Sequence, residues 1–206
     1  MNAGLSSLTK LKQAVLPESL RASATWDDTL LALGLGVAEA MDDYLGRKLG
    51  RVVGDTSECD AQRIFVSVPR YPVAVWTAVE MQTTPTGTWE DISDQVSRYL
   101  NKEGLILFRT PPGDEHATIR VTYTGGLWWD TTEDASGSLP SGATAIPQSL
   151  VTAWAMQVQA QCNALDLFGA QAGKDVLGSA SNLLTNAEAF IPAVKAMLGP
   201  FRRMAA

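Results

Sequence analysis

The chain has 206 residues, of which 46% are apolar and 18% charged. The apolar share is enough for a hydrophobic core, while the charged share lies below the ~25% usual for soluble domains. A net charge of −6 argues against binding nucleic acid through its phosphates, which requires clustered Lys and Arg. The N-terminus lacks the apolar region of a signal peptide, and no apolar run reaches the roughly 18 residues of a membrane span, so we expect no membrane association. Cys59 and Cys162 lie outside any metal-binding spacing and are expected to be reduced thiols.

The first 60 residues predict helices. Residues 6–22 fit one or two short helices, because serines precede apolar side chains at spacings of three and four. Residues 25–50 predict a longer helix, whose apolar face is formed by Leu30, Leu33, Val37, Met41 and Tyr44. Gly34 and Gly36 each weaken this helix by roughly 1 kcal/mol relative to Ala. Their small size lets another backbone come close, so we predict that both lie at a subunit interface.

Residues 61–125 predict a small antiparallel meander. Apolar side chains alternate with polar ones here, and turns rich in Pro, Gly and Asn separate the short segments. The expected strands cover residues 64–68, 73–77, 88–92, 96–100, 105–108 and 117–123. Short strands joined in this way are typical of antiparallel sheets.

Residues 126–146 predict a loop longer than the ~12–15 residues usual for a connection inside a compact domain. The loop begins with the adjacent Trp128 and Trp129. Two interpretations are open: the pair anchors the loop onto its own domain, or it docks onto another protein. We favour the anchor, because an exposed Trp pair is costly in a free subunit.

The C-terminal segment, residues 147–206, predicts helices. The first begins at Pro147 and carries apolar side chains over more of its circumference than packing on one core requires. We predict that its main stripe forms a subunit interface through Leu150, Trp154, Val158 and Leu165. Residues 181–198 predict a last helical region. In the basic tail, Arg202 and Arg203 either contact an acidic partner surface or are solvated.

The sequence contains no motif that predicts catalysis. The single histidine, His116, lies beside Asp114 and Glu115 in a turn and is interpreted as solvated. Serine-hydrolase, zinc-protease and phosphate-loop motifs are absent. Neighbouring carboxylates on a helix diverge by about 100°, so they do not form a metal site by themselves. We therefore expect no enzyme activity, no cofactor and no metal.

Together these segments predict an α+β fold: a mainly helical bundle with an inserted small antiparallel β-meander. Residues 1–60 form the N-terminal helices, 61–125 the β insertion, 126–146 the long loop and 147–206 the C-terminal helices. We expect them to form a single domain with extended segments.

The order of four segments is more specific than any one motif. They are Glu39–Arg47 (EAMDDYLGR), Val68–Val79 (VPRYPVAVWTAV), Ile119–Gly126 (IRVTYTGG) and Ile146–Ala153 (IPQSLVTA). A helix, a Pro-containing strand, a strand ending in glycines and a Pro-initiated helix follow one another. Over roughly residues 30–168, this arrangement resembles the head–tail connector, or adaptor, proteins of tailed bacteriophages.

The resemblance implies a structural virion protein without catalytic activity. Such proteins form a homo-oligomeric ring, typically a dodecamer, beneath the portal protein in the neck of the virion, after assembly in the host cytoplasm. The ring connects the head to a head-closure (stopper) or tail protein and extends the channel through which double-stranded DNA passes without specific binding. The alternatives are another head-closure or tail-completion virion protein and, less favoured, an unrecognised enzyme.

Overall fold

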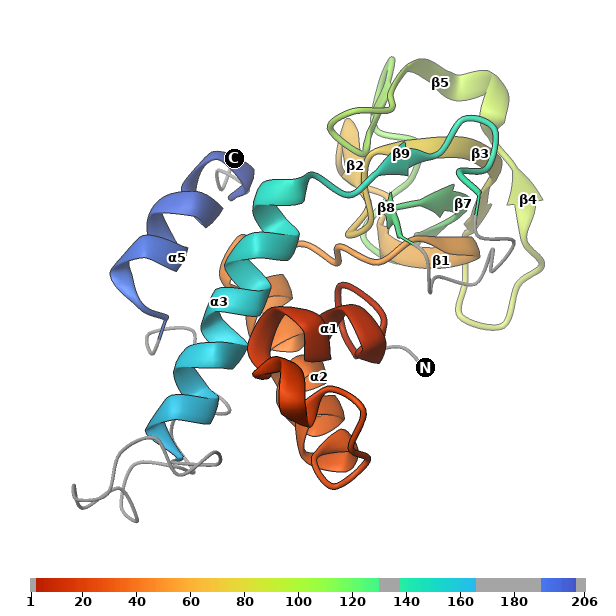
Figure 1. Ribbon diagram of the computed structural model, residues 1–206. Coiled ribbons are helices and arrows are strands. Elements are labelled where there is room, and N and C mark those ends of the chain that lie inside the picture. Colours follow the sequence, from red (N-terminus) through yellow and green to blue (C-terminus); the bar gives the residue numbers. More distant parts are fainter. Residues whose placement is uncertain (1–2, 130–137, 166–189, 203–206) are drawn as a thin grey trace. The chain divides into compact units, whose positions relative to one another are not determined.

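The computed structural model describes residues 3–129, 138–165 and 190–202 (Figure 1). The chain divides into two compact units. Of the described residues, unit 1 contains 3–47, 129, 146–165 and 190–202, and unit 2 contains 48–128 and 138–145. The two units are described separately below.

Unit 1 is helical. Its elements are α1 (Leu8–Val15), η1 (Glu18–Leu20), α2 (Asp27–Leu45), α3 (Gln148–Ala164), α5 (Pro192–Leu198) and η4 (Gly199–Phe201). Helices α1, α2 and α5 all pack against α3, which forms the middle of the unit. Each helix contributes one apolar face to this core, as the spacing of three and four predicts.

The ends of α2 follow from local chemistry. Asp27 and Asp28 occupy its first turn, where a negative charge favours the helix dipole. The Lys12 ammonium of α1 lies 2.6 Å from the Asp27 carboxylate and so joins α1 to the start of α2. Gly46 ends the helix, because its backbone lies in the left-handed region at φ 64°. The last residue of α2 is Leu45, whereas the sequence predicted a helix that continues to residue 50.

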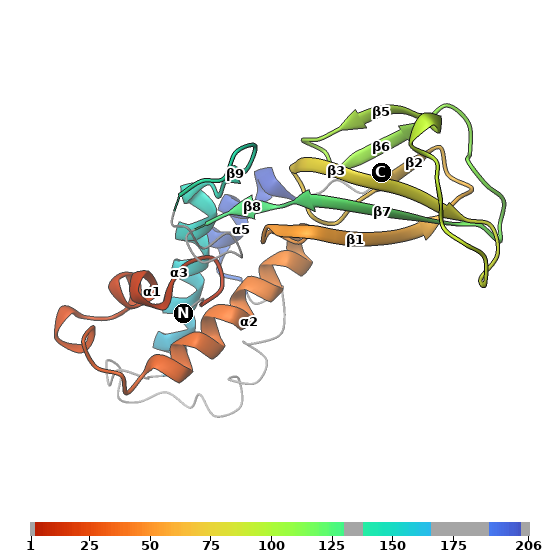
Figure 2. The same cartoon turned by 90° about the vertical axis from the view of Figure 1, so that its right-hand side faces the viewer.

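Unit 2 is built from strands. They are β1 (Val52–Asp60), β2 (Phe65–Ser67), β3 (Val73–Gln82), β4 (Glu90–Asp91), β5 (Val96–Leu100), β6 (Leu105–Phe108), β7 (Thr118–Gly125), β8 (Leu127–Trp128) and β9 (Thr144–Ala145), with the short helix η2 (Ser93–Gln95). The larger sheet has the order β1-β7-β3-β4 and the smaller one β2-β6-β5, both antiparallel. Figure 2 shows β7 between β1 and β3, with β6 and β5 in the neighbouring sheet. Strands β8 and β9 form a parallel pair.

The core of unit 2 lies between the two antiparallel sheets. Val66 and Ile106 face inward from the smaller sheet, and Val79 and Val121 face inward from the larger one. At one side of the core, the Trp76 ring lies between two tyrosine rings, with centroids 5.5 Å from Tyr99 and 5.9 Å from Tyr123. These aromatic contacts join the two sheets.

The predicted fold class is wrong in its proportions. The described residues form nine strands in three sheets, so the protein is not a mainly helical bundle with a small insertion. Strand β1 lies inside the segment 1–60 that was expected to be helical, and β8 and β9 lie inside the segment 126–146 that was expected to be a loop. Strand β1 escaped prediction because its inward positions are Asp55, Ser57 and Cys59, which give no apolar alternation.

The strands expected in segment 61–125 are present, but they do not form one meander. Strand β7, the last of them in the chain, pairs with both β1 and β3, whereas β2 pairs with β6. The helix expected from Pro147 is present as α3. Of the last expected helical region, residues 190–198 are described and contain α5, while its earlier part lies outside the described residues.

Candidate assembly surfaces

Three of the four residues predicted to form an interface on α3 are buried within unit 1. Leu150, Trp154 and Val158 retain at most 1% of their surface, because α1, α2 and α5 cover them. Leu165 is the residue after the end of α3 and is half-buried. The structure therefore gives the first three a role in packing the chain itself, and a role in contacts between subunits stays a prediction.

Gly34 provides the close backbone approach that the sequence predicted, and it does so within the chain. A Cβ at this position would lie 2.1 Å from the carbonyl oxygen of Ala3, which leaves room only for glycine. The carbonyl oxygen of Gly34 accepts a hydrogen bond of 2.8 Å from the Trp154 indole Nε1. Gly36, two residues further along α2, is half-buried, and its predicted place at an interface stays open.

The tryptophan pair divides between the units. Trp128 lies in β8, half-buried, and its indole Nε1 has no hydrogen-bond partner among the described residues. Trp129 keeps 7% of its surface exposed, so other parts of the chain cover most of its side chain. The favoured role of the pair as an anchor for the loop, and the alternative role in docking onto another protein, both stay predictions.

The described part of the basic tail lies against unit 1. The Arg202 guanidinium lies 5.2 Å from the centroid of the Tyr44 ring, within the range of a cation–π contact. The Tyr44 ring in turn meets Phe190 edge-on, with centroids 5.6 Å apart. Arg203 lies outside the described residues. The role predicted for both arginines in binding a partner stays open.

A polar network joins β1, β7 and the segment before β3. Arg70 Nε donates to Asp55 Oδ2 at 2.9 Å, and Arg70 Nη1 donates to the Gly50 carbonyl at 2.7 Å. The Tyr123 hydroxyl donates to the same Asp55 oxygen at 3.1 Å. Burial raises the pKa of Tyr123 well above its ordinary value. These contacts fix the inward Asp55 of β1, so the network has a structural role.

The outer face of the larger sheet is mostly polar, with Val75 on β3, 54% exposed, as an apolar exception. Strand β7 directs Thr118, Arg120 and Thr122 away from the core, because Ile119, Val121 and Tyr123 point into it. The Arg120 guanidinium lies 2.9 Å from the Glu80 carboxylate on β3 and 4.1 Å from the centroid of the Trp89 ring. The outward side of β7 therefore has the composition of a solvated surface.

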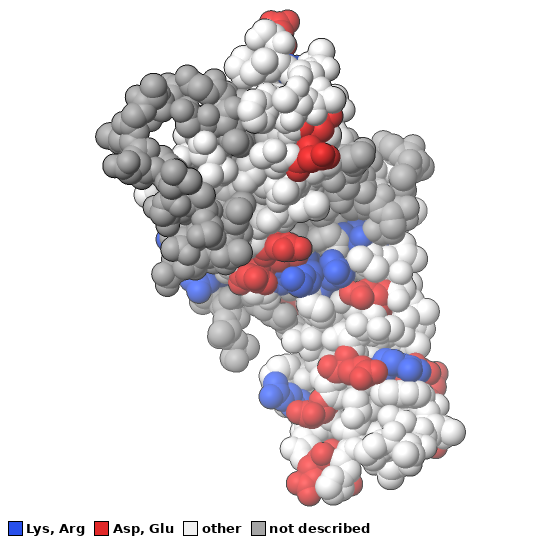
Figure 3. Space-filling model, turned by 90° about the horizontal axis from the view of Figure 1, so that it is seen from below, with Lys and Arg blue, Asp and Glu red and all other residues white. Residues whose placement is uncertain are grey.

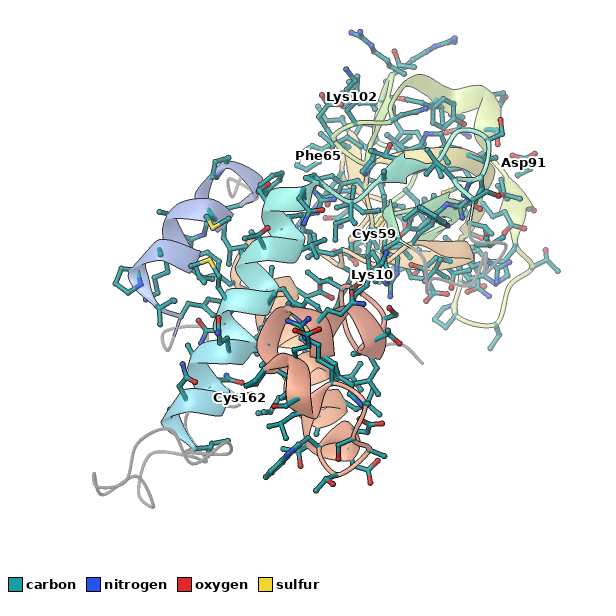
Figure 4. All side chains as sticks on the ribbon, in the orientation of Figure 1. Lys10, Cys59, Phe65, Asp91, Lys102 and Cys162 are labelled. Carbon is teal, nitrogen blue, oxygen red and sulfur yellow. The ribbon has the colours of Figure 1, made fainter. Side chains whose placement is uncertain are left out.

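The outer face of the smaller sheet is apolar. Val66 and Ile106 point inward as a cross-strand pair, so their neighbours point outward. The outward residues are Phe65 and Ser67 on β2, Leu105 and Leu107 on β6, and Arg98 and Leu100 on β5. Figure 4 labels Phe65 on β2 and Lys102 in the turn after β5. We call these six outward residues the small-sheet face.

Metal-ligating groups do not converge in the part of the chain that the structure describes. His116 is exposed, and its Nε2 lies 3.6 Å from the carboxylate of its neighbour Glu115. The described residues contain no group of three or more His, Cys, Asp or Glu able to hold a metal ion. None of the described helices is both long and apolar enough to cross a membrane.

Charged side chains are sparse on the face shown in Figure 3, where acidic and basic ones mostly lie beside one another.

Known structures share this architecture, although no protein-family model and no curated protein matches the chain. A chain in the neck of the empty GTA particle, computed with C6 symmetry, aligns with 97% of this chain and 90% of its own length, at a TM-score of 0.59 and 16% identity. A chain in the virion of the native gene transfer agent (GTA) particle aligns over the same shares, at a TM-score of 0.57 and 15% identity. A chain in the neck of the native GTA particle, computed with C12 symmetry, aligns over 97% and 89%, at a TM-score of 0.54 and 14% identity.

The chain has the fold of these chains from gene transfer agent particles. The alignment covers both units, because it includes 97% of the residues. At 14–16% identity the likeness concerns the fold. The resemblance to head–tail connectors, drawn from four short segments, is thereby confirmed at the level of architecture.

Proposed function

We propose that the chain is a structural virion protein of the neck, which forms a ring beneath the portal protein. The ring connects the head to a head-closure or tail protein and extends the DNA channel. The observation that carries this proposal is the fold match over 97% of the chain to a chain in a particle neck computed with C12 symmetry. That symmetry supports a ring of twelve identical copies.

The charge of the chain supports passage of DNA without binding. A net charge of −6 offers few groups to neutralise phosphates, so a channel formed by such subunits would not retain the duplex. The fold match to chains of gene transfer agent particles supports a structural role without enzyme activity. The proposed location is the head–tail junction of the virion.

Reconstitution with the portal protein of the same particle tests the proposal. The full chain is mixed with portal particles, and the products are analysed by sedimentation velocity and negative-stain microscopy. We expect a ring of the chain on one end of the portal particle. Binding only to a preformed connector ring, and not to the portal, would instead identify a head-closure protein. A chain that stays monomeric in both mixtures would overturn the neck assignment.

A further inference from the structure

The small-sheet face has the composition of a covered surface. In an antiparallel sheet with one solvated face, outward positions are usually polar. Strand β6 instead has the sequence Leu-Ile-Leu-Phe, with Ile106 and Phe108 buried inside and Leu105 and Leu107 directed outward. Phe65 lies beside Leu107 in register and is 39% exposed. Strand β6 is therefore apolar on both sides, as expected of a strand that is packed on both sides.

The charges around this face are mostly positive. Arg98 projects from β5 beside Leu107, and Lys102 follows in the turn that leads to β6. Glu103, next to Lys102, is the acidic group in that turn. A partner that fits this face would have an apolar centre and carboxylates at its margin.

The chain itself has a surface of this kind on α2. Ala32, Leu35, Gly36 and Glu39 recur at spacings of three and four, so they lie on one side of the helix. Leu35 is 44% exposed, and Glu39 is exposed beside it. Asp28 and Asp43 extend the same side toward the two ends, and α2 contains no Lys or Arg. We call these six residues the α2 stripe.

We propose that the small-sheet face of one subunit binds the α2 stripe of a second copy of this chain. The apolar groups match, and the charges are of opposite sign. The two surfaces differ from each other, so the contact is head-to-tail. A contact of this type closes into a ring when the rotation between neighbouring subunits is a whole fraction of 360°. This inference rests on the proposed ring and specifies the surfaces that build it.

Thiol crosslinking between two populations tests the contact directly. In a Cys59→Ser background, one population carries Ala32→Cys on the α2 stripe and the other carries Ser67→Cys on the small-sheet face. Both replacements are close in size and leave Leu35, Phe65 and the charged groups unchanged. The full-length proteins are mixed, alone and with portal particles, and treated with a short bis-maleimide. A crosslinked dimer that forms only when both variants are present shows that the two surfaces meet between copies.

The polar outer face provides the matched control. Thr56→Cys replaces an exposed residue on β1, in the larger sheet, and is mixed with Ala32→Cys in the same way. We expect at least tenfold more dimer from the Ala32→Cys and Ser67→Cys pair than from the control pair. If sedimentation shows assembly but both pairs give equal yields of crosslinked dimer, the inference is overturned and the proposed function is left intact. No assembly in any mixture would overturn both.

A charge exchange provides a second test that does not require a new thiol. Arg98→Glu should weaken self-association about threefold, as expected for a pair at the margin of an interface. Mixing that variant with Glu39→Arg should restore part of the loss, since the opposite pairing is then available. Weakening without restoration would show that these two residues do not meet.

Discussion

The two outer faces of unit 2 differ in chemistry, although they belong to one domain with a shared core. Strand β7 in the middle of the larger sheet directs Thr118, Arg120 and Thr122 outward, whereas strand β6 in the middle of the smaller sheet directs Leu105 and Leu107 outward. The core of unit 2 needs apolar side chains on the inward sides of the sheets and not on their outward sides. The apolar outward residues of β6 therefore indicate a use outside the core, which we assign to a neighbouring subunit.

The largest expected effect compares the two sides of β6. Ile106→Ala removes a fully buried side chain and should lower the free energy of unfolding by about 2–5 kcal/mol. Leu107→Ala, on the outward side, should cost less than half as much in the isolated chain, because Leu107 is only half-buried. Urea unfolding of the two variants measures both values. Equal losses would show that the outward side is covered within the single chain.

The second prediction compares the two faces in assembly. Phe65→Ser with Leu107→Ser should leave the fold intact and weaken self-association at least tenfold, because two apolar side chains lose their burial. Thr56→Ser with Thr122→Ser, on the polar face, should change it little. Sedimentation velocity over a range of concentrations measures the association, and circular dichroism checks the fold. A similar loss from both double variants would remove the distinction between the faces.

The third prediction concerns the inward side of β1. Burial raises the pKa of the Cys59 thiol from 9.0 to about 11. Between pH 9 and about 11, the folded protein therefore keeps the thiol proton that the unfolded chain loses. The contribution of Cys59 to the free energy of unfolding is complete below pH 9 and should decline as the pH rises from 9 to about 11.

Cys59→Ser supplies the control for this pH dependence. Cys162 titrates in both proteins, so the difference between their unfolding curves isolates Cys59. We expect the wild-type chain to lose more stability than the variant over this range. Parallel curves would mean that Cys59 is accessible to solvent in the folded state.

The smallest expected effect is on the polar face. Arg120→Gln removes the ion pair with Glu80 and the contact with the Trp89 ring. Because these groups are partly exposed, the loss should be about 0.5–1 kcal/mol and should shrink in high salt. Thermal unfolding at low and high ionic strength measures it. A loss as large as that of Ile106→Ala would mean that Arg120 is part of the core.

Local sequence patterns predicted the individual elements better than their assembly. Alternation of apolar residues located β2 and β3, and the turns rich in Pro, Gly and Asn on either side located β5, β6 and β7. Alternation does not determine which strands pair, and so β7 was not expected between β1 and β3. Strand β1 has Asp55 on its inward side, where a long-range contact with Arg70 and Tyr123 stabilises it. A contact between residues so distant in sequence leaves no local signal.

The same limit applies to the candidate surfaces. The wide apolar surface of α3 was interpreted as an interface, but a helical period cannot tell whether its own chain or another one covers a helix. In the structure, Trp154 bonds to Gly34 and is buried within unit 1. The small-sheet face was missed for the complementary reason. The sequence placed Leu105 and Leu107 in a strand, but it did not show which side of that strand faces outward. Only the pairing of Val66 with Ile106 shows that Leu105 and Leu107 lie on the outward side of β6.

A symmetrised reconstruction of the neck of the particle that contains this chain tests the central claim most directly. We predict a ring of identical copies with this fold at the head–tail junction, and with the small-sheet face of each copy on the α2 stripe of the next. A neck without this fold would contradict the account. A ring in which the small-sheet face is open to solvent would contradict the proposed contact alone.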